Sequence, residues 1–292
     1  MLLQQLANGI FIGAVYALFA VGYTLVFGIL DILNLAHASI FMAAAFIALA
    51  LAVHGTPIPL AFGGAIVGAG IVGIILDRIA FAPLRRRSAG MLVPLISSIG
   101  FALVVQGIVR TIFGPEEYRF GDLPIATAQF HVAGLTFGLL DVTVLVVALL
   151  LVAGLSYVLR ATTLGRNIRA VAEDRVAAAL LGIDIERTIA LTFFIASALG
   201  GAAGILTGLQ FNSVSLDMGS RIELKGLAVI ILGGMGSVTG AVVGALLLGV
   251  VEALSVAYIS SSYRDAIAFG VMFVILVVRP RGLFGRRALR AA

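Results

Sequence analysis

The sequence has no cysteine among its 292 residues, which excludes disulfides, thiolate nucleophiles and cysteine metal sites. Its only lysine, Lys225, precedes a glycine-rich run instead of closing one, so the chain has no P-loop for ATP phosphates. The three histidines, His37, His54 and His131, are far apart, and neither H-E-x-x-H nor G-x-S-x-G occurs. We therefore expect no enzymatic activity, no catalytic residue, no metal and no cofactor bound by this chain. Any ATP used in its function would be hydrolysed by a separate polypeptide.

Charged residues are also scarce, at 11% of the chain, while 61% of the residues are hydrophobic and the mean hydropathy is +1.17. A bilayer core about 30 Å thick needs roughly 20 apolar residues for each helical span, and this sequence contains many such runs. The runs are continuously apolar and do not alternate, which favours helices over barrel strands. The sequence thus predicts an all-α polytopic membrane protein with about eight transmembrane helices in one transmembrane domain, residues 1–292.

The predicted spans follow from the apolar runs. They cover residues 5–28, 35–53, 58–81, 91–113, 138–159, 189–209, 226–258 and 265–278. The first run has no basic residues before it and is too long for the hydrophobic region of a cleavable signal, so we expect it to be a span. Glycine recurs at every fourth position within residues 200–208 and 236–244, which predicts close packing between helices.

Basic residues predict the orientation of the chain in the membrane. They gather in residues 85–87, in the loop 160–188 and in the tail 279–292, all of which should be cytoplasmic by the positive-inside rule. The loop 114–136 is acidic and, together with residues 212–221, should lie outside, as should the N-terminus. This clustering accounts for the net charge of +5, so we expect membrane lipids as partners and no nucleic acid.

The apolar segment 226–258 is longer than one ordinary span and shorter than two. The chain is predicted to be outside near residue 217 and inside at residue 279, so an odd number of crossings must lie between them. The segment also contains the glycine-rich sequence G-G-M-G-S at residues 233–237. We expect a broken or re-entrant segment near 226–240, which membranes tolerate where the backbone lines a cavity or is buried in protein. One long, tilted helix is the alternative.

Residues 165–187 combine charged side chains with an apolar stripe at helical spacing. We expect a cytoplasmic helix near 166–182 that ends at Gly182, because glycine suits the position after a helix. Its polar face mixes acids with arginines, and its centre is rich in alanine. A helix that lies on anionic lipid would be more uniformly basic, so the pattern favours a slim helix that docks into a protein groove. A helix on the membrane surface is the alternative.

Polar residues within the apolar spans are candidates for a translocation path. Asn34 and His37 lie at a polar break, where the N-terminus of a half-helix would suit a carboxylate. Helix capping by Asn34 and interior packing of His37 are the alternatives. Ser97 and Gln106 either line the path or form hydrogen bonds between helices, and bonding between helices is the better interpretation.

Glu252 is the one ionisable residue that we expect well inside the membrane, where it either bonds within the bundle or acts on substrate or gating. Gly234 and Gly236 are further candidates for the path, although close helix packing is the simpler explanation of glycines at this spacing. Ion-coupled carriers also need ionisable groups at depth. An ion-coupled secondary carrier, or a channel for small polar solutes, is therefore the alternative function, but neither needs a docking helix.

Four motifs occur along the chain. Residues 169–184 read RAVAEDRVAAALLGID, residues 22–28 read GYTLVFG and are followed by LNLAH at 33–37, residues 231–237 read ILGGMGS, and residues 279–285 read RPRGLFG. The first is similar to the coupling loop of ABC importer permeases, and all four together resemble the branched-chain amino acid permease family, the LivH-like subunits. The resemblance covers residues 9–285. The loop departs from the E-A-A…G pattern of other importers, so residue roles from those classes do not carry over.

The resemblance implies a multi-pass permease of the bacterial plasma (inner) membrane that imports branched-chain or related small apolar amino acids by alternating access. It implies as partners a second, LivM-like permease subunit, two cytoplasmic ATP-binding subunits and a periplasmic or extracellular substrate-binding protein. The implied ATPase-coupling residues are Arg169, Ala172, Glu173, Asp174, Ala178, Leu181 and Gly182.

Overall fold

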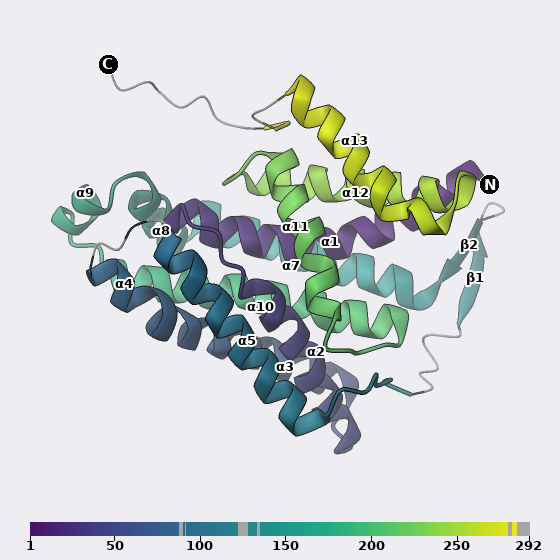
Figure 1. Ribbon diagram of the computed structural model, residues 1–292, viewed down its shortest axis with the longest axis horizontal. Coiled ribbons are helices and arrows are strands. Elements are labelled where there is room, and N and C mark those ends of the chain that lie inside the picture. The colour runs from purple at the N-terminus through teal and green to yellow at the C-terminus, as the bar shows by residue number, and fades with distance from the viewer. Residues whose placement is uncertain (88–89, 91, 122–127, 133–134, 280–281, 285–292) are drawn as a thin grey trace.

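The computed structural model describes the chain except residues 88–89, 91, 122–127, 133–134, 280–281 and 285–292 (Figure 1). The long helices are α1 (Leu2–Leu30), α2 (His37–Val53), α3 (Ile58–Leu76), α5 (Leu92–Phe113), α7 (Leu139–Ala161), α10 (Ile185–Phe211), α11 (Met218–Gly233), α12 (Val238–Tyr258) and α13 (Arg264–Val278). The short elements are the π-helix η1 (Asp77–Phe81), α4 (Ala82–Arg86), α8 (Thr163–Glu173), α9 (Arg175–Leu180), the 3-10 helix η2 (Ser261–Tyr263) and the antiparallel strands β1 (Gln129–Val132) and β2 (Leu135–Gly138). Each predicted span contains a helix, which confirms the predicted all-α membrane fold.

The transmembrane helices form an inner and an outer group. Each helix has a most apolar stretch, and the buried share of that stretch differs widely. It is 83% in α1 and 78% in α10, but 28% in α3, 22% in α5, 17% in α7 and 11% in α13. In water such exposed apolar faces would be costly, but lipid tails are as apolar as the side chains themselves. The outer helices therefore suit contact with lipid or with another membrane subunit, and α1 and α10 form the core with the short helix α2.

Glycine allows the core helices to approach closely. On α10, Gly204 lies against the backbone of Phe41 on α2 and leaves no room for a Cβ atom. Gly233 and Gly240 meet in the same way, backbone to backbone, where α11 passes into α12. Small residues at such contacts let backbones pack closely where lipid provides no hydrophobic driving force. These contacts confirm the close packing that the glycine spacing predicts.

The segments predicted to lie outside gather at one end of the molecule. Gln4, near the start of α1, exchanges two hydrogen bonds with the backbone of Thr136 on β2, at 2.8 and 2.9 Å. The backbones of Tyr118 and Val214 pair through a β-bridge, which joins the two predicted outer loops. Figure 1 shows the N-terminus beside the β1–β2 hairpin at the right-hand end. The N-terminus and these outer segments are thus on the same side, as predicted.

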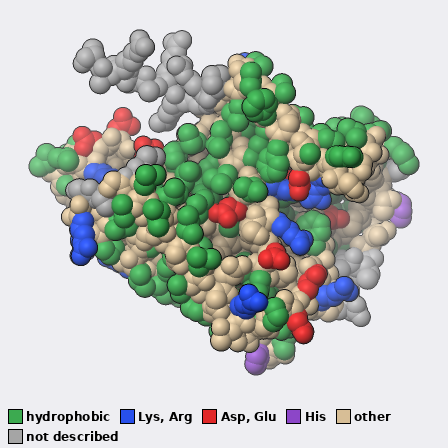
Figure 2. Space-filling view, in the orientation of Figure 1, with side chains coloured by type: hydrophobic (Ala, Val, Ile, Leu, Met, Phe, Trp, Pro, Cys, Tyr) green, Lys and Arg blue, Asp and Glu red, His purple; other side chains and the backbone are tan. Residues whose placement is uncertain are grey.

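The segments predicted to be cytoplasmic gather at the opposite end. Figure 1 shows α4, α8 and α9 together at the left-hand end. In the same orientation Figure 2 shows a largely hydrophobic face, with charged side chains at that left-hand edge and over the right half. In this view, the part between the left-hand edge and the centre is free of charged side chains, as contact with lipid requires. Most of the predicted basic tail, 279–292, lies outside the described residues.

The predicted break within residues 226–258 is confirmed, because α11 ends at Gly233 and α12 begins at Val238. Gly234 and Gly236 both have positive φ angles, 96° and 82°, which a helix cannot accommodate. The Ser237 side chain caps α12 by accepting a hydrogen bond from the Gly240 N–H group. One long, tilted helix, the alternative interpretation, is therefore wrong. Three helices, α11, α12 and α13, follow residue 217 among the described residues, and the odd number of crossings stays a prediction.

The C-terminal motif packs onto this break. The N–H groups of Leu283 and Phe284 donate to the carbonyl oxygens of Leu232 and Gly233, at 2.7 and 3.0 Å. These two carbonyls are among the last four of α11, which have no partner within the helix. Gly282 turns the chain into this position with φ +74° and has no room for a Cβ atom. Residues 282–284 and the end of α11 thus form one structural unit.

Candidate functional site

The predicted docking segment consists of two helices and not of one. Glu173 ends α8 and Arg175 begins α9, because Asp174 between them has an extended backbone with φ −154°. The Asp174 carboxylate then caps α9 by accepting from the N–H groups of Val176 at 2.7 Å and Ala177 at 3.0 Å. The expectation of one continuous helix near 166–182 was wrong at this point. Aspartate competes for backbone N–H groups, which favours caps over helix interiors.

The end of α9 is an exposed apolar surface. Gly182 follows it with φ +80°, which confirms the predicted stop. Val176, Leu180 and Leu181 are 70%, 85% and 80% exposed, whereas Ala178 is buried against the protein. Contiguous exposed apolar side chains at the polar end of a membrane protein mark a protein interaction surface. The exposed members of the predicted coupling set are Arg169, Ala172, Glu173, Asp174, Leu181 and Gly182.

Arg175 joins α9 to the core of the membrane domain. Its Nη2 atom donates to the carbonyl oxygens of Ile29, at 3.1 Å, and Leu30, at 3.3 Å, in the last turn of α1. A cation is favoured there by the unpaired carbonyls and by the helix dipole. Burial, and next the nearby Arg85, lower the pKa of the Arg175 guanidinium. Any movement of α9 therefore acts directly on the most buried span.

A second ionic contact joins the same end to α3 and α10. Arg85, on α4, pairs with the fully buried Asp77 of the π-helix at 2.5 Å and with Glu186 of α10 at 3.0 Å. One guanidinium thus connects two helices across a partly buried site. The α8–α9 segment rests on helices that are themselves cross-linked, so it is attached to the whole bundle and not to one span.

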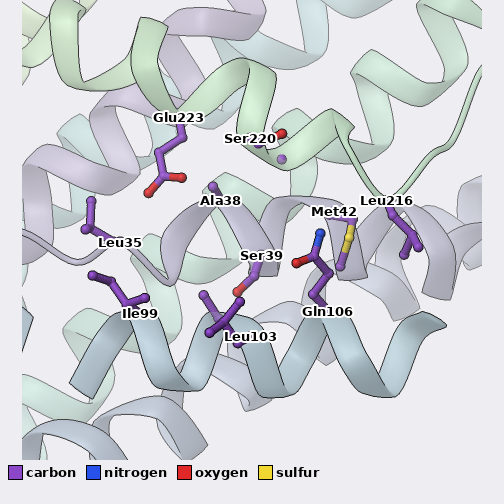
Figure 3. A pocket seen from close by; sticks show the side chains of 12 residues that line it. Leu35, Ala38, Ser39, Met42, Ile99, Leu103, Gln106, Leu216, Ser220 and Glu223 are labelled. Carbon is purple, nitrogen blue, oxygen red and sulfur yellow. The ribbon is translucent and has the colours of Figure 1, made fainter. Parts of the chain in front are cut away.

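A cavity of about 230 Å³ lies between α2, α5 and α11 (Figure 3). Most of its wall is apolar, and four polar side chains face it: Ser39, Gln106, Ser220 and Glu223. The volume is below the roughly 300–1,000 Å³ typical of sites for drug-sized ligands. A mainly apolar wall with a few converging polar groups suits a small amphiphilic solute.

The residues predicted for the path occupy different places. Gln106 lines the cavity. Ser97 donates to the Ala80 carbonyl at 3.1 Å, which is the bonding between helical segments that was the better interpretation. Gly234 and Gly236 lie in the break between α11 and α12, and Gly236 packs near Gly28 at the end of α1. The cavity therefore brings together Gln106 with residues that the sequence analysis did not select.

Asn34 and His37 are buried next to the cavity without lining it, although Leu35 between them does. The side-chain oxygen of Asn34 accepts a hydrogen bond from the Ala36 N–H group at 3.2 Å. The backbone carbonyl of Asn34 accepts one from the His37 N–H group at 3.1 Å. Asn34 thus forms the turn before α2. The His37 ring packs between Phe19 and other core groups, with ring centroids 4.8 Å apart. This geometry agrees with the packing interpretation of His37, whereas the residue that precedes α2 is Ala36 and no side chain caps that helix, so the capping interpretation of Asn34 is wrong.

Glu252 is at the centre of a buried ionic network. It is 1% exposed, and its carboxylate lies 2.6 Å from Lys225 Nζ and 3.2 Å from Arg264 Nε. The Tyr16 hydroxyl donates to it at 2.8 Å. Lys225 also pairs with Asp265 at 3.0 Å. The network joins α1, α11, α12 and α13, which is the bundle-bonding alternative, and a role of Glu252 in the path stays a prediction.

A second cavity, of about 640 Å³, lies on the other side of α11. Tyr16, Lys225 and Arg264 of the ionic network border it. Among the described residues, no group of three histidine or acidic side chains comes close enough to hold a metal ion. Neither cavity therefore has the donor set of a metal centre.

Sequence reasoning missed Glu223, Lys225 and Arg175. The first two lie between the predicted outer segment 212–221 and the apolar run at 226, so they fell in no predicted span, whereas α11 begins at Met218. A helical spacing was present: residues 219, 220 and 223 fall on one face, and residues 221 and 225 on another. For Arg175 no local signal exists, because its partners belong to α1.

Comparison with known proteins agrees with the geometry. The family model described as "Branched-chain amino acid transport system / permease component" matches residues 5–276. The chain is 36% identical to the high-affinity branched-chain amino acid transport system permease protein BraD of Pseudomonas aeruginosa, covering 97% of this chain and 96% of BraD. It is 34% identical to LivH of Escherichia coli, with 97% and 96% covered. A probable LivH of Methanocaldococcus jannaschii is 30% identical, with 92% and 88% covered. No solved structure matches the chain.

Proposed function

Because the chain belongs to the branched-chain amino acid transport system permease family, we propose that it is the membrane-spanning permease subunit of an ATP-driven importer for branched-chain or related small apolar amino acids. The observation that carries this proposal is the pairing of a small, largely apolar cavity among α2, α5 and α11 with an exposed docking surface on α9. The chain is a multi-pass protein of the plasma (inner) membrane, and it contributes a path and a mechanical contact but no catalytic group.

The proposed assembly contains four kinds of protein subunit. A second, LivM-like permease completes the path, because the cavity here is bordered by outer helices such as α5 whose apolar faces are exposed. Two cytoplasmic ATP-binding subunits bind the α8–α9 ends, and a periplasmic or extracellular binding protein delivers the substrate. ATP is bound and hydrolysed by the partner subunits.

The proposed mechanism is alternating access. Closure of the ATP-binding subunits displaces α9, and Arg175 passes that displacement to the end of α1. Packed helices respond by switching between discrete arrangements and not by continuous deformation. The α11–α12 break and α1 lie together at this end, so they are the elements that a displacement of α9 reaches first.

Transport is tested in proteoliposomes that contain this chain with its cognate permease, ATP-binding and substrate-binding subunits. We expect uptake of labelled leucine to require internal ATP and the binding protein, and to be insensitive to ionophores. Uptake by this chain without ATP-binding subunits, driven by an ion gradient, would overturn the proposal and support the carrier alternative.

Docking is tested with the double substitution Leu180→Glu and Leu181→Glu. Both side chains are at least 80% exposed, so the substitutions should not disturb folding. We expect the ATP-binding subunits to be lost from the purified complex while the second permease stays bound. Arg86→Glu is the matched control, since Arg86 is exposed on α4 at the same end of the molecule. Retention of the ATP-binding subunits by the double variant would exclude α9 as their docking site.

A further inference from the structure

Glu223 is a half-buried carboxylate on α11 whose side chain is directed into the 230 Å³ cavity (Figure 3). The ion pairs of the described residues leave it without a cationic partner. The residues that line the cavity include no arginine, lysine or histidine. An ionisable residue within a transmembrane bundle is costly, so its retention points to a function.

The other face of the same helix shows the contrast. Two residues further along α11, Lys225 faces Glu252 at 2.6 Å and Asp265 at 3.0 Å, so its charge is neutralised within the chain. In the larger cavity on that side, Lys225 and Arg264 already pair with Asp265, and the exposed Arg221 adds a further positive charge. Of these two cavities, the one that Glu223 faces is lined by an acid and by no cation.

We infer that Glu223 binds the ammonium group of the substrate as it passes through the cavity. This inference rests on the proposed function and deepens it, because it assigns a residue to substrate recognition. A carboxylate that loses water regains its stabilisation from a charged hydrogen-bond donor, and hydrogen bonds between charged groups are about twice as strong as neutral ones. An amino acid supplies such a donor and carries it away again when it leaves.

The rest of the lining fits the remaining parts of an apolar amino acid. Gln106 of α5 presents an amide to the cavity (Figure 3), and its NH₂ group is a donor for the substrate carboxylate. Leu35, Ile99 and Leu103 provide apolar surface for a branched side chain. The ammonium is therefore recognised by a full charge, whereas the carboxylate is recognised by a neutral dipole.

This asymmetry predicts an order of ligands. Without a cation in the lining, an acid that lacks the ammonium group meets only the repulsion of Glu223. An amine that lacks the carboxylate keeps the charged contact. The site should therefore bind leucine and 3-methylbutylamine and reject 4-methylpentanoate, although the three share the same branched chain.

The experiment uses the assembled complex of both permeases and the ATP-binding subunits in nanodiscs, without binding protein. Saturation-transfer NMR measures binding of leucine, 3-methylbutylamine and 4-methylpentanoate, and leucine uptake and ATP hydrolysis are measured in proteoliposomes with binding protein. The variants are Glu223→Gln, which removes only the charge, and Glu223→Asp, which keeps it. Glu116→Gln is the matched control, because Glu116 is exposed in the outer loop.

We expect Glu223→Gln to weaken binding of leucine and of the amine by about 10- to 100-fold and to lower leucine uptake, while ATP hydrolysis persists. Glu223→Asp should recover part of the ligand binding and part of the leucine uptake. Glu116→Gln should match the wild type in all measurements. Equal binding of leucine by the wild type and Glu223→Gln, or equal binding of the acid and the amine by the wild type, would overturn the inference.

The two proposals fail in different ways. If the wild-type complex carries no leucine at the expense of ATP, the proposed function is wrong and the role of Glu223 is wrong with it. If the wild type carries leucine and Glu223→Gln carries it equally well, only the role of Glu223 is wrong. If Glu223→Gln fails to assemble, the assembled Glu223→Asp protein decides: binding of 4-methylpentanoate as tight as that of 3-methylbutylamine contradicts recognition through the ammonium group.

Discussion

Glu223 and Glu252 show how one residue type serves two purposes in neighbouring helices. Glu252 is 1% exposed and is held by Lys225, Arg264 and Tyr16. Glu223 is half-buried and faces a cavity without a cation in its wall. A buried charge that is paired costs little further, whereas an unpaired one keeps its desolvation penalty until a ligand binds. Their roles thus follow from their surroundings and not from their depth in the membrane.

At the residue scale we predict that Glu252→Gln destabilises the protein more than Lys225→Met. The first change leaves two cations without their shared partner, and breaking a buried pair in this way costs about 3–5 kcal/mol. The second leaves Glu252 with Arg264 and Tyr16. The measurement is the temperature at which the detergent-solubilised protein loses its monodisperse peak in size-exclusion chromatography.

The double variant provides the control for this prediction. Lys225→Met combined with Glu252→Gln removes one cation together with the anion, so it should be less destabilised than the sum of the single variants. Equal or greater loss of stability in Lys225→Met than in Glu252→Gln would show that Glu252 is not the centre of the network.

At the scale of elements, the division between α8 and α9 determines how the segment is used. Because Asp174 ends one helix and caps the next, α9 can present Leu180 and Leu181 outward while Arg175 reaches back to α1. A continuous helix would continue along the axis of α8, and its last turn would follow that direction. Because of the break, the same segment presents an exposed apolar surface and also binds the end of α1.

We predict that Arg175→Ala uncouples ATP hydrolysis from transport. The change removes charged hydrogen bonds to Ile29 and Leu30, each worth roughly 1.5–3 kcal/mol, without altering the exposed face of α9. Uptake should fall about tenfold, while hydrolysis stimulated by the binding protein persists. The measurement is the number of ATP molecules hydrolysed for each substrate transported.

Arg166→Ala is the matched control for Arg175→Ala. Arg166 is an exposed arginine on α8, so its removal changes the charge of the same segment without touching α1. A parallel fall of hydrolysis and uptake in Arg175→Ala would indicate loss of docking instead of loss of coupling, and the proposed role of Arg175 would then be wrong.

At the scale of the whole molecule, contacts distant in sequence gather the predicted outer segments at one end and the predicted cytoplasmic segments at the other. Gln4 bonds to Thr136, and Tyr118 pairs with Val214, at the outer end. Arg85 bonds to Glu186 at the other end. The positive-inside rule states which end is cytoplasmic, and the fold shows that the grouping of segments is self-consistent.

The absence of cysteine makes this orientation directly testable. We predict that Glu117→Cys reacts with a membrane-impermeant maleimide in intact spheroplasts, because Glu117 is exposed at the outer end. Arg87→Cys, exposed after α4, should react only after permeabilisation. The unchanged protein, which has no thiol, measures the background. Labelling of Arg87→Cys in intact spheroplasts would reverse the assigned orientation.

The site was less predictable than the fold. The sequence pattern indicated a docking segment near 166–182 with its stop at Gly182. It named Gln106 as a candidate for the path but favoured bonding between helices, whereas the structure places Gln106 at the cavity. It did not identify Glu223, because the apolar run begins at residue 226 and hydropathy assigned the preceding turns of α11 to a loop. It did not identify Arg175, because no pattern within residues 165–187 refers to the end of α1.

The sequence by itself determined where the apolar spans lie, the separation of outer and cytoplasmic segments, and a break near residues 226–240. These depend on hydropathy, charge and glycine content, which act over one or two turns of the chain and can be read there. The tertiary structure alone decided that Glu252 is neutralised by Lys225 and Arg264, that Glu223 is free to face a ligand, and that Arg175 caps α1. Such pairings bring together residues from different helices, and electrostatic stabilisation depends on that distance and burial, which local sequence does not contain.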